Sequence, residues 1–262
     1  LNSFGSDEVY IEKYLQTPRH VEIQVAADDH GNVVHFFERD CSIQRRNQKI
    51  IEEAPAFDIP QEKLDEIRKI AVNTCKKINY KGLGTFEFLY EDGNFYFIEM
   101  NTRLQVEHTI TEMITGIDLV KLQIMIAAGQ EIPLSQEDIN CRGHAIECRI
   151  NAEHHETFIP SPGKVTEFHP PGGFRIRTDS HLYSGYTVPQ YYDALIAKIC
   201  AHSSDRISAI RKMRVALEET YIEGINTNAT LHQRILNDET FVANKHTINY
   251  LEDELLKHDS WI

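Results

Sequence analysis

Positive charge is scarce in this chain: 27 lysines and arginines stand against 40 aspartates and glutamates, for a formal net charge of −13 at pH 7. Because so acidic a protein repels polyanions, we expect neither nucleic acid nor an anionic membrane as a partner. No apolar run reaches the length needed to span a bilayer, and the first residues lack the basic and apolar regions of a secretion signal. The pattern predicts a protein that neither crosses a membrane nor is exported.

Cysteines are few, and their spacing forms no recognisable framework. The five cysteines are odd in number and include no CxxC pair: Cys41, Cys75, Cys141, Cys148 and Cys200. A disulfide scaffold or a zinc site would need paired spacings. The cysteines are instead typical of reduced thiols, which favours a cytoplasmic protein.

The chain has the length and composition of a globular protein with a substantial core. Its 262 residues are 41% hydrophobic and 26% charged, enough for one large or two ordinary domains. Strand-like alternation and helical periodicity follow one another without a regular strand–helix repeat, which predicts an α+β fold with a largely antiparallel sheet. Strands are expected near 9–11, 21–25, 33–37, 143–151, 174–177 and 194–201, and helices near 60–80, 119–128, 205–220, 226–236 and 247–257. A loop is expected at 102–108, Asp118 is expected to cap the helix near 119–128, and a polar stretch at 133–141 suggests a boundary.

Two carboxylates lie where a purely structural strand would carry apolar residues. Residues 84–107 read as two strands joined by a tight turn, with Glu87 on one arm and Glu99 on the other. A two-residue loop would leave the two glutamates on opposite faces. A three-residue loop with Gly93 in a bulge pairs Glu87 with Phe97 and makes Glu99 its diagonal neighbour, roughly 7–8 Å away between α-carbons. We predict the three-residue loop.

The same arms offer a set of oxygen ligands. Glu87, Glu99 and the amide of Asn101 would suit Mg²⁺ or Mn²⁺, and such sites clamp nucleotide phosphates. The alternative is an ordinary strand with two solvated glutamates. Against that alternative, Glu99 lies within FYFIEM, where a charge needs a partner.

A short basic segment stands out in this acidic chain. Arg45, Arg46 and Lys49 lie close together beside two glutamines, which suits a small oxyanion or a phosphate. No stacking aromatics are interleaved, so a nucleic-acid strand is a poor fit. The alternative is a solvated loop in which these cations pair with Glu52 and Glu53.

Six segments together resemble biotin carboxylase, the ATP-grasp component of biotin-dependent carboxylases such as acetyl-CoA carboxylase: EKYLQTPRHVEIQV, RDCSIQRRNQKIIEEAPA, GTFEFLYEDGNFYFIEMNTRLQVEH, GHAIECRINAE, PSPGKV and YYDALIAKI. The resemblance covers nearly the whole chain. The family's N-terminal nucleotide-fold domain and glycine-rich lid have no counterpart here, so the chain resembles the C-terminal half only. It implies a lid and hinge-strand remnant at 1–15, an ATP-grasp lobe at 16–135 and the biotin carboxylase C-terminal domain at 136–262.

The resemblance also implies roles for individual residues. The metal ligands would be Glu87, Glu99 and Asn101. The adenine hinge and nucleotide pocket would comprise Glu12, Lys13, Leu15, His20, Gln44, Leu89 and Ile248. The bicarbonate pocket would comprise Lys49, Arg103, Gln105 and Val106, with Glu107 as general base and Arg149 beside bicarbonate and biotin.

Two further positions bear on partners and on subgroup. Phe174 and Arg177 match the family's dimer contact, so a homodimer is implied. Asn47 stands where the family often has histidine in RRHQK; an amide can still hydrogen-bond nucleotide hydroxyls, so we interpret it as subgroup variation.

The implied activity is ATP-dependent carboxylation of biotin by bicarbonate through carboxyphosphate, as in the first half-reaction of acetyl-CoA carboxylase in fatty acid synthesis. The implied partners are the biotin carboxyl carrier protein and carboxyltransferase subunits. The alternatives are the corresponding region of a urea, pyruvate or acyl-CoA carboxylase, another ATP-grasp enzyme such as a carbamoyl-phosphate synthetase, and a non-catalytic module for self-association or docking. Without the lid, we expect this piece alone to bind ATP weakly and not to turn over.

Overall fold

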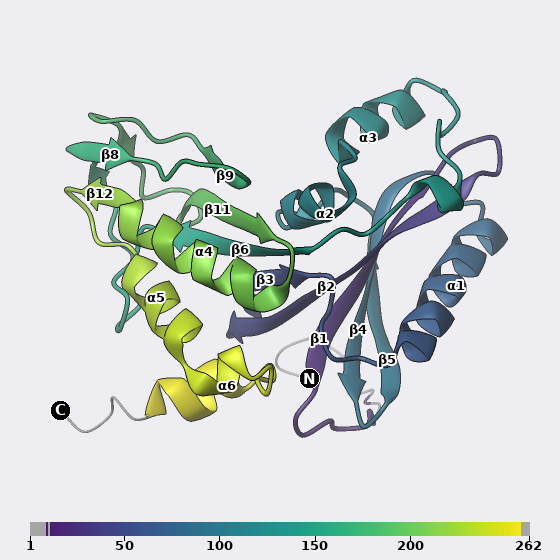
Figure 1. Ribbon diagram of the computed structural model, residues 1–262, viewed down its shortest axis with the longest axis horizontal. Helices are drawn as coiled ribbons and strands as arrows, with labels where there is room; N and C mark the ends of the chain where they lie inside the picture. The colour runs from purple at the N-terminus through teal and green to yellow at the C-terminus, as the bar shows by residue number, and fades with distance from the viewer. Residues whose placement is uncertain (1–8, 10, 258–262) are drawn as a thin grey trace.

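The computed structural model of the protein describes residue 9 and residues 11–257. Its main sheet is built from eight strands in the order β5-β4-β1-β2-β3-β6-β11-β9, and every neighbouring pair is antiparallel. The α+β fold with an antiparallel sheet is therefore confirmed (Figure 1). The strands are β1 (Arg19–Ala27), β2 (Val33–Arg45), β3 (Gln48–Ala54), β4 (Gly82–Glu91), β5 (Asn94–Asn101), β6 (His144–Asn151), β9 (Ile176–Ser180) and β11 (Leu195–Ser203).

Two small two-stranded sheets and several helices complete the described part. The small sheets pair β7 (Gly163–Lys164) with β10 (Thr187–Val188) and β8 (Glu167–His169) with β12 (Tyr221–Glu223). The helices are α1 (Gln61–Lys77), α2 (His108–Thr115), α3 (Leu119–Ala127), α4 (Arg206–Glu219), α5 (Ala229–Asn237) and α6 (Glu239–Val242), with a 3₁₀ turn at Gln136–Asp138 and a π turn at Leu251–Leu255. None of these helices is long and apolar enough to cross a membrane.

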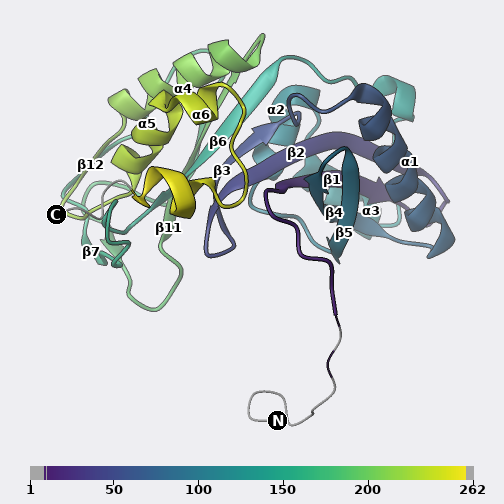
Figure 2. The ribbon, with the colours of Figure 1, turned by 90° about the horizontal axis from the view of Figure 1, so that it is seen from below.

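Helices α1 and α3 cover opposite faces of the β1–β2–β4 region. Alternate residues of β1, including Ile23 and Val25, pack against Ile67 and Cys75 of α1. Ala26 points the other way and packs with the apolar residues of α3. Because successive strand residues face opposite sides, His20, Glu22 and Gln24 share the face that α3 covers. Figure 2, viewed from below, places α1 at one end of the molecule and α4 to α6 at the other.

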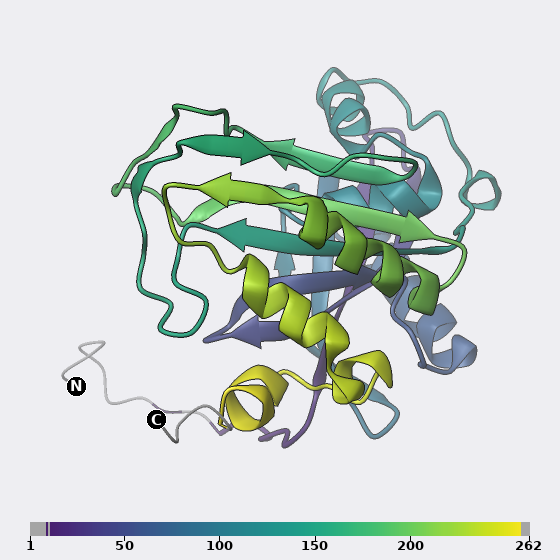
Figure 3. The ribbon, with the colours of Figure 1, turned by 60° about the vertical axis from the view of Figure 1, so that its left-hand side comes forward.

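The largest apolar core lies between the strands β6 and β11 and the helix α4. Ile146, Cys148 and Ile150 of β6 pack with Ala209 and Met213 of α4, and α5 and α6 extend this core. Figure 3 shows α4 and α5 lying across the strands on that face. The intervening residues of β6, which include the functional candidates, therefore face the side on which α2 lies.

The β4–β5 hairpin corrects the predicted turn. Glu91 pairs with Asn94, so the loop has two residues, Asp92 and Gly93, both with positive φ (50° and 76°). The predicted three-residue loop is wrong. A bulge between Glu87 and Phe88 nevertheless shifts the register by one residue, so Glu87 pairs directly with Glu99. The bulge compensates for the shorter loop, so both carboxylates lie on one face of the hairpin. The predicted three-residue loop would also have placed them on one face.

Several other expectations need correction. The basic segment is a hairpin: β2 continues to Arg45, and the chain turns at Arg46 and Asn47 into β3. Helix α2 was not predicted, and it begins at His108, the last residue of the loop expected at 102–108. The helix expected at 247–257 is present but shorter, as a π-helix over Leu251–Leu255. Residues 9 and 11 are not in a strand, and residue 10 lies outside the described residues. Helix α3 is confirmed, with Asp118 capping it through the Lys121 backbone N–H at 2.7 Å.

Candidate functional site

One cavity of about 700 Å³ collects most of the residues singled out from the sequence. It lies on the face of the main sheet shared by β1, β3, β4 and β6, and the loop before α2 closes one wall. The sequence-predicted residues that line it are His20, Gln44, Lys49, Glu87, Leu89, Glu99, Asn101, Arg103, Gln105, Val106, Glu107, Arg149 and Ile248. Its further lining includes Asn47, Gln48, Ile98, Asn151, Glu153, Asp193, Ala194 and Leu195. Residues more than 200 positions apart therefore meet at one site.

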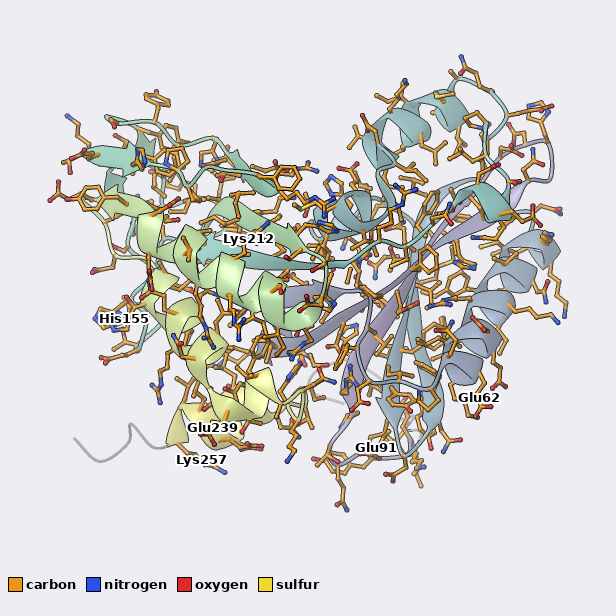
Figure 4. All side chains as sticks on the ribbon, viewed as in Figure 1. Glu62, Glu91, His155, Lys212, Glu239 and Lys257 are labelled. Atoms are coloured by element: carbon orange, nitrogen blue, oxygen red, sulfur yellow. The ribbon has the colours of Figure 1, made fainter. Side chains whose placement is uncertain are left out.

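The carboxylates of Glu87 and Glu99 are joined by an amide. Asn101 Nδ2 lies 3.0 Å from Oε1 of each glutamate. Glu87 is buried, and its other contacts include His20 Nε2 at 2.9 Å from Oε2 and Gln105 Nε2 at 2.6 Å from Oε1. Glu91, at the turn end of β4 (labelled in Figure 4), instead accepts a hydrogen bond from the backbone N–H of Thr17. The direct pairing of Glu87 with Glu99 thus brings two carboxylates and the side-chain amide of Asn101 together, and residues of these types suit a hard divalent cation.

Glu87 is held in its ionised form. Burial would raise the pKa of this carboxyl, but the hydrogen bond from His20 and the charge on Lys49 outweigh burial and lower it to about 2. A carboxylate with so low a pKa carries its negative charge across the neutral pH range. It therefore meets one requirement of a metal ligand, which is to be deprotonated without competition from protons.

Lys49 is the cationic centre of the cavity. Its Nζ lies 2.7 Å from Glu22 Oε2, 3.1 Å from Glu87 Oε1 and 2.6 Å from Glu107 Oε1. Burial works to lower the pKa of this amine, but the surrounding carboxylates, Glu22 first, raise it well above its ordinary value. Lys49 is consequently a permanent positive charge at the point where the acidic groups converge.

Glu107 is clamped between two cations. It precedes the first residue of α2, and its side chain makes no capping hydrogen bond. Oε1 accepts from Lys49, and Oε2 lies 3.0 Å from Arg149 Nη2. Glu107 is 2% exposed, so the groups that it contacts fix its orientation. It is a helix-entry residue whose carboxylate is directed into the cavity.

Arg149 reaches the cavity from β6. Its Nε lies 2.5 Å from Glu52 Oε1, and its Nη2 contacts Glu107. Among the described residues, its ion pairs are with Glu52 and Glu107, and it forms none with Glu147, two residues earlier on the same strand. Burial acts to lower the pKa of Arg149, but the nearby carboxylates, Glu52 first, outweigh burial and raise that pKa above its ordinary value, so Arg149 stays charged.

The basic segment divides between two roles. Gln44 and Lys49 face the cavity, whereas the Arg45 guanidinium lies 3.8 Å from the centre of the Phe158 ring and Arg46 is exposed. The alternative in which Glu52 and Glu53 pair with these cations as a solvated loop is wrong. Both glutamates are buried; Glu52 pairs with Arg149, and Glu53 pairs with Arg206 and His144.

Sequence reasoning missed a buried polar layer beneath the cavity. Arg39 is fully buried and donates to Glu22 Oε1 at 2.5 Å, to Gln24 Oε1 at 2.8 Å and to Gln105 Oε1 at 2.9 Å. Burial raises the pKa of Glu22, yet Arg39 and Lys49 together lower it to about 2. The available signal was the alternation of β1, which places Glu22 and Gln24 on the same face as His20.

The remaining candidates lie away from the cavity lining. Glu12 is exposed, Lys13 Nζ lies 2.6 Å from the Tyr96 hydroxyl, and Leu15 is buried. Phe174 is 81% exposed. Arg177 donates to Glu112 at 2.6 Å and, from Nε, to Asp179 at 2.8 Å.

Comparison with known proteins accords with this geometry. Residues 1–135 match the family described as "Carbamoyl-phosphate synthase L chain, ATP binding domain", and residues 147–253 match "Biotin carboxylase C-terminal domain". Among curated proteins, biotin carboxylase of Haemophilus influenzae is 59% identical and that of Allochromatium vinosum 58%, each over 253 residues, 97% of this chain and 56% of the relative. The chain therefore spans about half the length of the curated relatives it matches.

Solved structures give the same result. A biotin carboxylase from Campylobacter jejuni matches with a TM-score of 0.92 and 49% identity, covering 96% of this chain and 56% of that one. The biotin carboxylase subunit of a pyruvate carboxylase matches with a TM-score of 0.90 and 46% identity, over 93% of this chain and 54% of that one. The fold and the acidic, lysine-centred cavity define an ATP-grasp protein. Within that class, the chain belongs to the biotin carboxylase family, and the resemblance in its sequence is confirmed.

Proposed function

We propose that this chain forms the metal-, bicarbonate- and biotin-binding half of an ATP-dependent biotin carboxylase. The observation that carries the proposal is Glu107, a buried carboxylate set between Lys49 and Arg149 in the cavity that also contains Glu87 and Glu99. Such a carboxylate can accept a proton while the flanking cations hold the anion that results. The division into an ATP-grasp lobe at 16–135 and a C-terminal domain at 136–262 is part of this proposal.

The donor set of Glu87, Glu99 and Asn101 would hold Mg²⁺ or Mn²⁺, which supplies charge neutralisation at the phosphates of ATP. Lys49 and Arg103 bind bicarbonate, and Glu107 takes its proton. The bicarbonate oxygen then attacks the γ-phosphorus of ATP, the bond to the ADP oxygen breaks, and carboxyphosphate and ADP result. His20, Gln44, Leu89 and Ile248 are proposed to line the nucleotide pocket, with Glu12, Lys13 and Leu15 at the adenine hinge.

Carboxyphosphate breaks into CO₂ and phosphate, and the phosphate takes the proton from N1 of biotin. Arg149 stabilises the enolate oxygen that develops on the biotin ureido group, and Gln105 and Val106 complete the bicarbonate pocket. N1 then forms the new bond to CO₂. In the full-length parent, a lid closed over this cavity would exclude the water that hydrolyses carboxyphosphate.

Two features of the cellular role belong to the same proposal. The acceptor is biotin on a carrier protein that also serves carboxyltransferase subunits, and Phe174 and Arg177 lie at a homodimer contact. All five cysteines are free thiols, which supports a reducing compartment such as the cytoplasm. The parent is an acetyl-CoA carboxylase; a pyruvate carboxylase is the second candidate, because a pyruvate carboxylase component of Methanothermobacter thermautotrophicus is 52% identical over 92% of this chain.

The test is ADP release from the proposed full-length parent, measured with and without free biotin and with and without bicarbonate. We expect release that requires both, and no turnover by this chain alone. Formation of carbamate from ammonia and bicarbonate, without a biotin requirement, would contradict the proposal.

The metal assignment has its own test in the same parent. Glu87→Gln and Glu99→Gln each remove one anionic ligand and should lower ATP turnover by roughly 10²-fold or more, since the cation no longer neutralises the phosphates. Isothermal titration with Mn²⁺ should show weakened binding in both variants, while circular dichroism stays that of the wild type. Wild-type Mn²⁺ affinity in both variants would remove these residues from the metal site.

A further inference from the structure

Two glutamates that the proposed mechanism does not use face each other behind the cavity. Glu52 on β3 pairs directly with Glu147 on β6, and the side chains of both are completely buried. They lie on the cavity side of the sheet, since Glu52 contacts Arg149 and Glu147 contacts Thr109 of α2. Opposed carboxylates on neighbouring strands repel each other when both are ionised.

Each carboxylate has one satisfied oxygen and one that is not. Glu52 Oε1 accepts from Arg149, and Glu147 Oε2 accepts from the Thr109 hydroxyl. Within the described residues, Glu52 Oε2 and Glu147 Oε1 are buried without a hydrogen-bond partner. Buried polar atoms are rarely left unpaired, and a proton between two facing carboxyl groups satisfies both at once.

The charges around Glu52 and Glu147 are compatible with one proton on the pair. The groups facing the pair are Arg149 on β6, Lys198 and Cys200 on β11, Cys41 on β2 and Glu107 at the start of α2. Burial raises the pKa of Glu52 to about 8 against the opposing effect of Arg149, and burial also raises the pKa of Glu147. The wider network sets the carboxylates of Glu22, Glu52, Glu87, Glu107 and Glu147 against the cations of Arg39, Lys49, Arg149 and Lys198. One proton on the pair balances these charges.

We propose that Glu52 and Glu147 share a single proton and act together as a positioning device for Arg149. The pair, with one negative charge, holds the Nε and Nη2 edge of the guanidinium through Glu52 Oε1. Nη1 makes no hydrogen bond to any described residue, and Arg149 lines the cavity. That nitrogen is therefore free for an anion, whereas a doubly ionised pair would leave an excess negative charge beside the guanidinium, and this charge would repel an anion.

The protonation state can be measured in this chain by infrared spectroscopy. A protonated buried carboxyl absorbs above the amide I band and shifts in D₂O. We expect such a band at pH 7 and its loss in Glu52→Gln and in Glu147→Gln. Glu38 is a second buried acid with an unpartnered oxygen, and any band that it contributes should persist in both variants.

The matched control is Glu53→Gln, next to Glu52 on the same strand. Glu53 is equally buried but fully paired with Arg206 and His144, so its substitution should leave the carboxyl band unchanged. A spectrum that is the same in the wild type, Glu52→Gln and Glu147→Gln would overturn the shared proton. Loss of the band in Glu53→Gln alone would overturn it as well.

The positioning role rests on the proposed function and is tested in the full-length parent. Glu147→Gln should raise KM for bicarbonate roughly tenfold with a smaller change in kcat, as is typical when a supporting hydrogen-bond partner is lost. The alkaline limb of kcat/KM should also move, because the shared proton is gone. An alkaline limb at the wild-type position would refute the role. If the parent shows no biotin-dependent turnover at all, the proposed function fails while the infrared result still decides the shared proton.

Discussion

Glu52 and Glu53 are neighbours on β3 that point to opposite faces of the main sheet, and both are buried. Glu53 accepts two hydrogen bonds from Arg206, at 2.7 and 2.9 Å, and lies 2.8 Å from His144 Nε2. Burial raises its pKa, but Arg206 outweighs burial and holds that pKa well below its usual range. Glu52 has one arginine, which it shares with Glu107, and its pKa is raised.

The two faces differ in how fully the cations of their buried ion clusters are paired. On the α4 face, the remaining N–H groups of Arg206 donate to the carbonyls of Phe241 and Val242, so the cluster is closed on itself. On the cavity face, Lys49 and Arg149 are each divided among several carboxylates. A closed cluster stabilises the fold, whereas a shared one leaves donors that a substrate can engage.

The largest expected effect is on the cavity face. In the full-length parent, Glu107→Ala should lower bicarbonate-dependent turnover by about 10²–10⁴-fold, because the proton acceptor is lost. ADP release at saturating bicarbonate measures it. Glu62→Ala on α1 (labelled in Figure 4), an exposed glutamate remote from the cavity, serves as the control and should be unaffected. A rate near that of the wild type in Glu107→Ala would place the base elsewhere.

On the α4 face, the loss should be in stability. Glu53→Gln leaves Arg206 buried without its counter-charge and should lower the free energy of unfolding by about 3–5 kcal/mol. Urea unfolding of this chain measures the change. Glu52→Gln is the paired comparison and should cost clearly less, since the proposed shared proton already removes part of its charge. Equal losses in the two variants would erase the distinction between the faces.

The two faces should also differ in their pH dependence. The lowered pKa of Glu53 on the α4 face means that its stabilisation is present above pH ~4.5 and is lost as the pH falls below that value. The raised pKa of Glu52, about 8, acts in the other direction: its contribution is complete below pH ~4.5 and is lost as the pH rises through 8. Urea midpoints from pH 3 to 9 should show both limbs, and Glu52→Gln should remove the alkaline one. A variant that keeps an unchanged alkaline limb would assign it to another group.

The smallest expected effect concerns local capping of α3, which covers the cavity-side face. Asp118→Ala removes the acceptor for the Lys121 backbone N–H and should cost about 1 kcal/mol in urea unfolding. Lys121→Ala keeps that backbone donor and is the control. If both variants are equally stable, tertiary packing of α3 makes the cap dispensable.

Much of the fold followed from local signals, and the departures have local causes. The Asp118 cap and the alternation at 143–151 predicted α3 and β6 because both signals depend on neighbouring residues. The turn after β4 was wrong because a bulge at Glu87 lies several residues from the loop that it compensates. Nothing in the sequence near Glu87 specifies a bulge. The predicted loop was one residue too long and the bulge was not predicted, and these two errors shift the register in opposite directions, so the predicted facing of Glu87 and Glu99 was still correct.

The site was predictable in its members more than in its connections. Glu87, Glu99 and Asn101 could be grouped from spacing on one hairpin, and the family resemblance added Lys49, Glu107 and Arg149. The roles of Glu22 and Arg39 were missed because an alternating strand does not reveal whether its polar face is covered. That face is buried by α2 and the loop around Gln105, which lie more than 60 positions away in the chain.

Hydrogen bonding continues across the main sheet from β5, which carries Glu99, to β6, which carries Arg149. Glu99 and Arg149, at the two ends of the cavity floor, therefore belong to one continuous hydrogen-bonded sheet, and we expect the distance between them to stay the same when substrates bind. Any movement that opens the cavity for substrate entry has to come from segments outside the main sheet. Crystal structures with and without nucleotide should show the strands superimposing closely while the displacement is confined to surrounding loops.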